Sequence, residues 1–173
     1  QAGLAQSLHY LGLVSWSSGD LSQAADLLID ASRVWQSLGF DWELACCIPG
    51  HLADIARDAG KTTDAVRLYQ ECLARNWARH DSENIAWSLS GLAEIAAGDD
   101  QLDVGRTFMG LAEYFRGITG APLTPHIERD HQRAKALVIK RAGTARFETA
   151  NAIIGETEVS EGIAAALAFS RQQ

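Results

Sequence analysis

The sequence predicts an all-α protein, an α-solenoid of three helical hairpins closed by helices at its C-terminal end. Three observations predict this fold. An apolar pattern of helical spacing recurs about every 40 residues, a small residue stands at the same place in each copy, and turn residues separate two helical runs within each copy. With 47% hydrophobic residues, a chain of 173 residues can bury a sizeable core as a single domain.

The repeat is visible in three aligned segments. Residues 11–19 (LGLVSWSSG) match residues 52–60 (LADIARDAG), 41 positions later, and residues 92–100 (LAEIAAGDD) follow after another 40. Each segment forms the end of a first helix, and a second helix follows it. The second helix carries a small residue near its start and two further small or apolar residues behind it. These second-helix positions are Ala24, Leu28 and Ala31, then Ala65, Tyr69 and Cys72, then Gly105, Met109 and Ala112. The predicted hairpins are therefore 1–40, 41–81 and 82–121.

The tetrapeptide 60–63 (GKTT) has the letters that end a phosphate-binding loop, but its context differs. Such a loop needs a glycine at position 55, where this chain has Ile55, and a strand ahead of it. The residues before Gly60 have helical spacing instead. We therefore interpret GKTT as the turn inside the second hairpin and expect no nucleotide binding.

Two further features concern the ends of the hairpins and a break within one helix. Gly39, His80 and Gly120 stand at matching positions at the ends of the three hairpins, although histidine is a poorer left-handed residue than glycine. Pro49 falls inside the first helix of the second hairpin, where it is expected to kink or shorten that helix.

The pattern changes after residue 121. A loop at 120–125 (GAPLTP) precedes a polar helix at about 126–142, and two short helices finish the chain. The first of these holds Phe147 and Ile153, and the second runs from Ser160 through Ala168. Residues 122–173 are expected to cap the last hairpin.

Composition narrows the function classes. The net charge is −7 and no basic cluster is present, which argues against direct contact with nucleic acid or an anionic membrane. Three cysteines form neither a disulfide framework nor a zinc-ligand pattern, so a cytoplasmic location is expected. The chain begins within a helical pattern, and we expect it to be a fragment of a larger protein.

No catalytic, cofactor-binding or metal-binding residue emerges from the sequence. His126 and His131 lie five apart, on different faces of a helix, and are expected to be solvated polar residues. The carboxylate pairs at residues 99–100 and at 156 and 158 lie at helix ends, where acidic residues cap helices. We expect a protein that is not an enzyme and needs no cofactor.

The third hairpin and the tail carry a recognisable order of motifs. They are residues 105–116 (GRTFMGLAEYFR), 119–123 (TGAPL), Pro125, 142–147 (AGTARF), Gly155, 159–163 (VSEGI) and 166–168 (ALA). This order resembles the C-terminal repeat region of bacterial LuxR-type transcriptional regulators with a predicted ATPase core. Gly105 and Gly162 depart from that pattern, which has alanine there. The resemblance implies an upstream ATPase module and DNA-binding domain, with this region as sensor or interaction platform.

The hairpins themselves resemble tetratricopeptide repeats, whose first helix carries leucine followed by glycine or alanine, as at 11–12, 52–53 and 92–93. The period exceeds 34 residues, so a HEAT-like geometry stays open. In tetratricopeptide-like hairpins the first helices build a concave wall. We predict that the residues of this wall are exposed and bind a partner. They are His9, Trp16, Asp54, Arg57, Asp58, Trp87, Ser90 and Glu94, with Leu13 and Gly50 beside them.

An acidic and aromatic wall of this kind suits a basic or neutral protein segment, with tryptophan as anchor. The upstream domains of the parent protein are one such partner. Trp16 and Trp87 could equally pack between the hairpins as core residues. The preferred hypothesis is a non-catalytic interaction and sensor domain of a signal-responsive transcriptional regulator. The alternative is a scaffold repeat or small-ligand sensor with no link to transcription.

Overall fold

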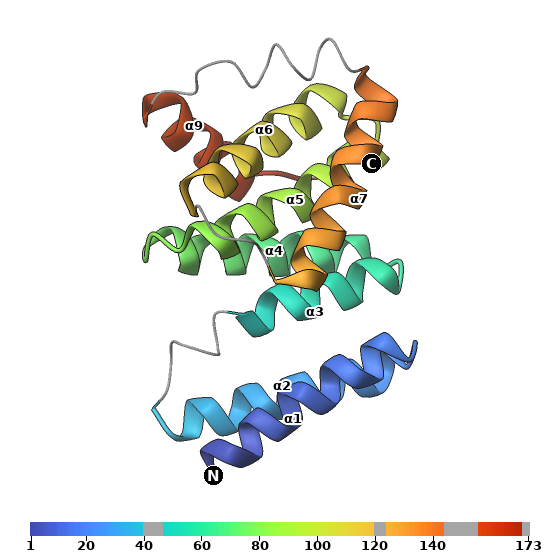
Figure 1. Cartoon of the computed structure of the whole chain (residues 1–173), viewed down its shortest axis with the longest axis vertical. Coiled ribbons are helices and arrows are strands. Elements are labelled where there is room, and N and C mark those ends of the chain that lie inside the picture. The colour runs from blue at the N-terminus through green and yellow to red at the C-terminus, as the bar shows by residue number, and fades with distance from the viewer. Residues whose placement is uncertain (40–46, 120–123, 144–155, 171–173) are drawn as a thin grey trace. The chain divides into compact units, whose positions relative to one another are not determined.

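The computed structural model describes residues 1–39, 47–119, 124–143 and 156–170 (Figure 1). Within these ranges the chain forms eight helices and no strand, so the prediction of an all-α protein is confirmed. Two compact units, Gln1–Leu68 and Tyr69–Gln173, divide the chain inside its fourth helix. The helices are α1 (Ala2–Ser17), α2 (Leu21–Ser37), α3 (Cys47–Asp58), α4 (Thr62–Trp77), α5 (Ser82–Gly98), α6 (Leu102–Thr119), α7 (Pro125–Ala142) and α9 (Glu156–Leu167).

The first six helices follow one another in three pairs, α1–α2, α3–α4 and α5–α6, and the short connections 18–20, 59–61 and 99–101 join the members of each pair. The members of the first pair and of the third pair pack against each other. In each connection one residue takes the left-handed conformation: Gly19 at φ 88°, Gly60 at φ 72° and Asp100 at φ 64°. The GKTT segment is therefore a turn followed by α4, with α3 rather than a strand ahead of it. Gly39 and His80 are left-handed as well, with φ of 70° and 58°.

Asp100 and His80 occupy a conformation that glycine adopts without steric strain. We expect His80→Gly to raise the free energy of unfolding by about 0.5 kcal/mol, because the relief of left-handed strain exceeds the extra entropy that glycine has in the unfolded chain. Asp100→Gly should raise it by less, because it also removes the hydrogen bond from Arg141 to Asp100. Asp99→Gly is the matched control, because Asp99 has an ordinary φ of −86° and gains nothing from glycine. Urea denaturation of the three variants measures this; equal or lower stability of His80→Gly and Asp100→Gly contradicts it.

Small residues let the two helices of the first hairpin approach closely. A Cβ placed on Gly12 of α1 would lie 2.9 Å from the Leu28 side chain of α2, so glycine is needed at that crossing. Around this contact Ala5, Ala24, Ala31 and Trp35 form a buried core that continues into α3 through Ile48 and Ile55. The equivalent small residues Ala53 and Ala93 are also buried.

Pro49 lies in the first turn of α3, which begins at Cys47. A proline there removes an N–H that has no partner within the helix, so it is tolerated.

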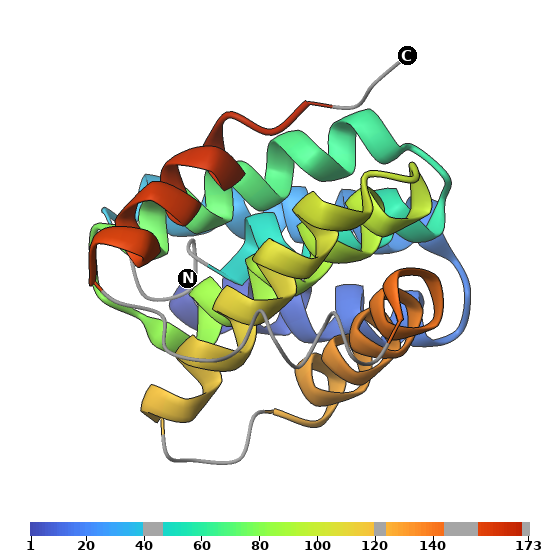
Figure 2. The same cartoon turned by 90° about the horizontal axis from the view of Figure 1, so that it is seen from above.

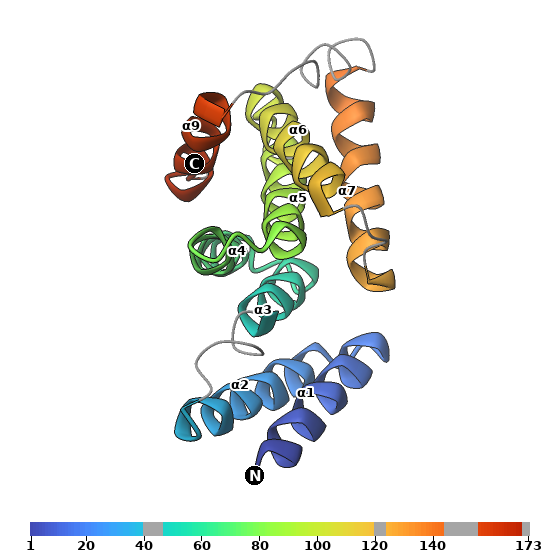
Figure 3. The same cartoon turned by 60° about the vertical axis from the view of Figure 1, so that its left-hand side comes forward.

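The second unit is built around α5, most of whose residues are buried. Tyr69 of α4 lies over Gly91, where an added Cβ would be only 2.2 Å from the phenol ring. Two helices flank the α5–α6 hairpin on opposite sides, α7 on one and α9 on the other (Figures 2 and 3). Gly162 of α9 lies against Leu111 of α6, and Phe169 packs edge-on against Phe108.

The C-terminal predictions hold in part. The polar helix expected at about 126–142 is α7, and the last expected helix is α9, which begins at Glu156 rather than Ser160. Gln70 of α4 binds the C-terminal end of α9. Its side-chain amide donates hydrogen bonds to the carbonyls of Ala166 and Phe169, at 3.0 and 2.9 Å. The short helix predicted around Phe147 and Ile153 lies outside the described residues.

Candidate functional site

The eight residues predicted for the concave wall all lie on first helices of the hairpins. They form two groups, which are His9, Trp16, Asp54, Arg57 and Asp58 on α1 and α3, and Trp87, Ser90 and Glu94 on α5. The first group belongs to unit Gln1–Leu68 and the second to unit Tyr69–Gln173. The two groups differ in what covers them.

In the first group, charged side chains of α3 bind one another, and one of them also accepts a hydrogen bond from α1. The Arg57 guanidinium donates to Asp54 Oδ1 at 2.8 Å and to Asp58 Oδ1 at 3.1 and 3.2 Å. The Trp16 indole Nε1–H donates to Asp58 Oδ2 at 2.9 Å. Asp58 therefore receives a donor from each helix, and this fixes the orientation of the indole on the surface of the first unit.

Two residues of this group are buried, although we predicted them to be exposed. The Asp54 side chain has no exposed surface, because it lies on the buried face of α3 and is neutralised by Arg57 three residues later. His9 is buried too, with its ring centroid 5.1 Å from that of His51. Gly50 beside them is also buried. Leu13, Trp16 and Asp58 keep part of their surface accessible, whereas the Arg57 side chain is only 10% exposed.

In the second group, Trp87 and Ser90 are only 2% exposed, so the prediction of an exposed wall is wrong there as well. The reason is α7, which packs along α5 and α6 (Figure 1). The Trp87 ring meets the His126 ring of α7 edge-on, with centroids 5.8 Å apart. This places Trp87 in the core, one of the two possibilities that the sequence left open.

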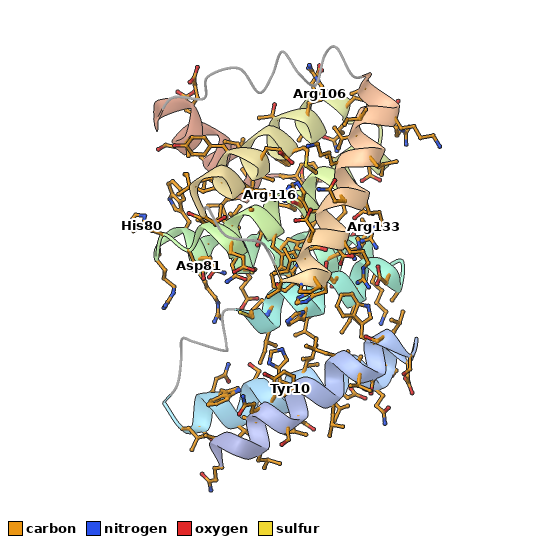
Figure 4. All side chains as sticks on the ribbon, in the orientation of Figure 1. Tyr10, His80, Asp81, Arg106, Arg116 and Arg133 are labelled. Atoms are coloured by element: carbon orange, nitrogen blue, oxygen red, sulfur yellow. The ribbon has the colours of Figure 1, made fainter. Side chains whose placement is uncertain are left out.

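Glu94 is the third member of the second group, and α7 engages it directly. Arg133 projects from α7 (Figure 4). Its guanidinium donates to Glu94 Oε1 at 2.9 Å and to Oε2 at 3.2 Å, which makes a bidentate contact with the carboxylate. Arg133 also lies 3.6 Å from the buried carboxylate of Asp130. Arg133 of α7 thus binds Glu94, the acidic residue of the α5 wall.

Beneath this pair lies a serine–histidine–glutamate network that sequence reasoning missed. Ser90 Oγ is 2.7 Å from His131 Nδ1, and His131 Nε2 is 2.5 Å from Glu113 Oε1. The three side chains come from α5, α7 and α6, in that order. The residue types are those of a hydrolytic triad.

The geometry does not suit nucleophilic catalysis. Ser90 Oγ is buried and also bonds to the carbonyl of Ala86 at 2.7 Å, so a substrate could not reach the hydroxyl. The ring is also reversed relative to a hydrolytic triad, in which Nε2 faces the serine. The network instead satisfies buried polar groups where three helices meet.

His131 is fully buried, which corrects the expectation that it is a solvated residue. A signal for this was present in the sequence. Ile127, His131, Ala134 and Val138 recur at helical spacing and are all buried, so this row is the inner face of α7. The many charged residues of α7 lie outside this narrow buried row.

Burial and hydrogen bonding shift two pKa values in the second unit. The hydrogen bond from His131 lowers the pKa of Glu113 from 4.5 to about 2; Lys135 adds to the lowering, and burial opposes it. Because Glu113 is therefore ionised at neutral pH, His131 Nε2 is the donor of their hydrogen bond. Burial lowers the pKa of His126 below 6.5, which favours the neutral ring against Trp87.

One sizeable pocket lies within the first unit. Its volume is about 670 Å³, and it is open at the surface between α2, α3 and the start of α4. Apolar side chains such as Ile29, Leu52 and Ile55 form its lining, and charged residues of both signs join them: Asp26, Asp64, Lys61 and Arg67. Its size and apolar lining are those of small-molecule sites in general.

Among the residues that the structure describes, no cluster of three or more histidine, cysteine, aspartate or glutamate side chains could hold a metal ion. None of the helices in those ranges has the length and apolar character needed to span a bilayer. Comparisons with protein-family models, with characterised proteins and with solved structures found no match to this chain.

Proposed function

We propose that this chain is a non-catalytic interaction and sensor domain, built as a tetratricopeptide-like α-solenoid, in a bacterial signal-responsive transcriptional regulator with an upstream ATPase core. The regulator assignment rests on the motif order of the last 70 or so residues. The solenoid assignment is supported by three consecutive hairpins with buried small residues at Gly12, Ala53 and Ala93.

The observation that carries the interaction role is the way α5 holds α7. An acidic and aromatic first-helix wall, represented by Glu94 and Trp87, accepts a helix whose contacting side chains include Arg133 and His126. The wall of the third hairpin thus already binds one helical segment through charge and aromatic contacts. The same surface chemistry on the first unit suits a partner segment of similar kind.

On the first unit the accessible wall offers Trp16 as an anchor and Asp58 as an acceptor for a basic side chain. The proposed partner is a basic or neutral protein segment, with the upstream domains of the parent protein as the specific case. Nucleic acid is not a proposed partner, because the chain carries a net charge of −7 without a basic patch.

Asp58 provides the binding test. We expect Asp58→Asn to weaken binding of the separately expressed upstream domains several-fold, and we expect the loss to shrink as salt rises, because an exposed charge is screened. Asp58 is partly exposed, so stability should change by less than about 1 kcal/mol. Asp54 is unsuitable for this test because it is fully buried, and its substitution would destabilise the fold.

Asp103→Asn is the control, since Asp103 is an exposed carboxylate on α6, a helix that carries no residue of the predicted wall. Titration calorimetry at two salt concentrations measures the binding. Equal affinity of the parent and Asp58→Asn removes the wall as the interaction surface. The full-length reading frame tests the regulator assignment separately: an ATPase core and a DNA-binding domain ahead of Gln1 are expected, and their absence overturns it.

The pocket of about 670 Å³ favours a second candidate function, a small-ligand sensor. An apolar fluorescent anion such as anilinonaphthalene sulfonate is a suitable probe, because the lining combines apolar side chains with Lys61 and Arg67. Filling the pocket with Ala25→Leu should remove probe fluorescence if the pocket takes ligands. Unchanged fluorescence with folded protein excludes this site.

A further inference from the structure

Helix α1 presents an apolar face to solvent. Leu4, Tyr10, Leu11 and Val14 are 53 to 64% exposed, and their spacing places them on one side of the helix, which we call the α1 face. No aspartate, glutamate, lysine or arginine occurs between residues 1 and 19. Helix α2, by contrast, carries the exposed charges Asp26, Asp30 and Arg33. A surface helix without charge and with a contiguous apolar stripe indicates a contact surface.

The chain itself shows what covers this face in the other hairpins. Val14 corresponds to Ile55 of α3 and to Ile95 of α5, and both isoleucines are buried. Leu11 corresponds to Leu52, which is half-buried, and to Leu92, which is fully buried. The positions that are exposed on the first hairpin are therefore covered on the second and third.

The cover is the second helix of the preceding hairpin. Ile55 belongs to the same core cluster as Ala24, Leu28 and Ala31 of α2, and Leu52 packs against that cluster. On the third hairpin, Tyr69 of α4 lies on Gly91, which is the counterpart of Tyr10. Each later hairpin thus receives the second helix of the hairpin before it.

We propose that the α1 face is a stacking surface for the second helix of a further hairpin of this repeat type, located ahead of α1 in the same polypeptide. The incoming helix is expected to carry the α2 pattern, with alanines and a leucine at the spacing of Ala24, Leu28 and Ala31. This proposal does not depend on the function proposed above.

A second copy of this chain is a poorer occupant. Stacking between copies would use the last second helix, α6, as the cover of α1 in the next copy. In this structure α9 already packs on α6, with Gly162 against Leu111, and Phe169, which follows α9, packs against Phe108. Helix α6 is therefore covered by residues of its own unit, whereas the α1 face is exposed.

The chain supplies its own test hairpin. Residues 1–41 placed directly before Gln1 of the full chain keep the 41-residue period between the first and second hairpins. We expect amide hydrogen exchange in residues 4–14 of the original α1 to slow by roughly tenfold or more, since covered helices open less often. Val14→Asp in the original α1 should abolish this slowing in the extended chain.

Two controls separate the outcomes. An extension of equal length made of glycine and serine should leave exchange in α1 unchanged, and Val14→Asp in the unextended chain should leave its fold intact. If the added hairpin is helical by circular dichroism but α1 exchanges as fast as before, the proposal is wrong. It is also wrong if sedimentation shows that the unextended chain forms a dimer that Val14→Asp dissociates, because the occupant is then a second copy.

Discussion

Replacing Trp87 with alanine is expected to lower the free energy of unfolding by about 3 to 5 kcal/mol, the usual cost of removing a fully buried aromatic side chain. Trp87 is 2% exposed on α5, and its ring packs edge-on against His126 of α7. Its removal would leave a cavity between α5 and α7, because the helices can only partly close around it. Urea denaturation followed by far-ultraviolet circular dichroism measures the loss.

Trp16→Ala is the matched control for this change. Trp16 is half-buried, and its indole makes one exposed hydrogen bond to Asp58. We expect a cost of about 1 to 2 kcal/mol from the lost bond and the smaller buried area. If Trp16→Ala and Trp87→Ala lower the free energy of unfolding equally, the burial of Trp87 in the structure is contradicted. Trp87→Phe should lie between alanine and the parent, because it keeps an aromatic ring in the space.

Replacing Glu113 with glutamine is expected to lower the free energy of unfolding near neutral pH by about 1 to 3 kcal/mol, less than the full pKa difference implies, because solvent screens this half-buried carboxylate. The pKa of Glu113 is about 2 in the folded protein and 4.5 in the reference state, a difference worth roughly 1.4 kcal/mol per unit. A carboxyl group with a lowered pKa stabilises the fold fully above pH 4.5, and this contribution is lost as the pH falls towards 2. Glu113→Gln should therefore flatten the decline in stability over this range.

The groups facing Glu113 define the control. His131, Lys135 and Arg116 all lie within 3.5 Å of its carboxylate, so the substitution removes one charge from a shared cluster. Glu128→Gln removes a more exposed carboxylate that pairs with Arg116, and it should cost less than about 1 kcal/mol. Urea denaturation at pH 7, 5 and 3 gives the comparison. Parallel pH profiles for the parent and Glu113→Gln would contradict the prediction.

His126 contributes in a different pH range. Burial lowers its pKa below 6.5, so folding favours the neutral ring and this contribution is lost as the pH falls below 6.5. The effect of Glu113 begins only near pH 4.5. Stability profiles can therefore separate the two groups, and the decline between pH 6.5 and 5 should persist in Glu113→Gln.

The local elements of the fold were predictable because they follow from short-range sequence signals. The repeat of Leu11, Leu52 and Leu92 with a small residue after each predicted where first helices run. Gly19 and Gly60 marked the turns, and a left-handed φ at both explains why. Pro125 marked the start of α7. Each of these signals acts within one or two helical turns of the residue that carries it.

The exposure of the candidate site was not predictable in the same way. Trp87, Ser90 and Glu94 formed a plausible open wall only as long as nothing packed on α5. Whether α7 lies there depends on contacts between residues about 40 positions apart, such as Ser90 with His131 and Glu94 with Arg133. The row of charges on α7 did not reveal that its opposite face is apolar enough to be buried.

The sequence by itself determined the helical class, the hairpin turns and the absence of a phosphate-binding loop at GKTT, since each depends on local backbone preference and spacing. The tertiary structure alone decided that Trp87 is a core residue, that His131 and Glu113 form a buried network, and that Asp54 is hidden while Asp58 is accessible. The physical reason is that burial is a property of the surroundings. A residue's type and spacing place it on a face of its helix, but only long-range packing determines whether that face meets water or another helix.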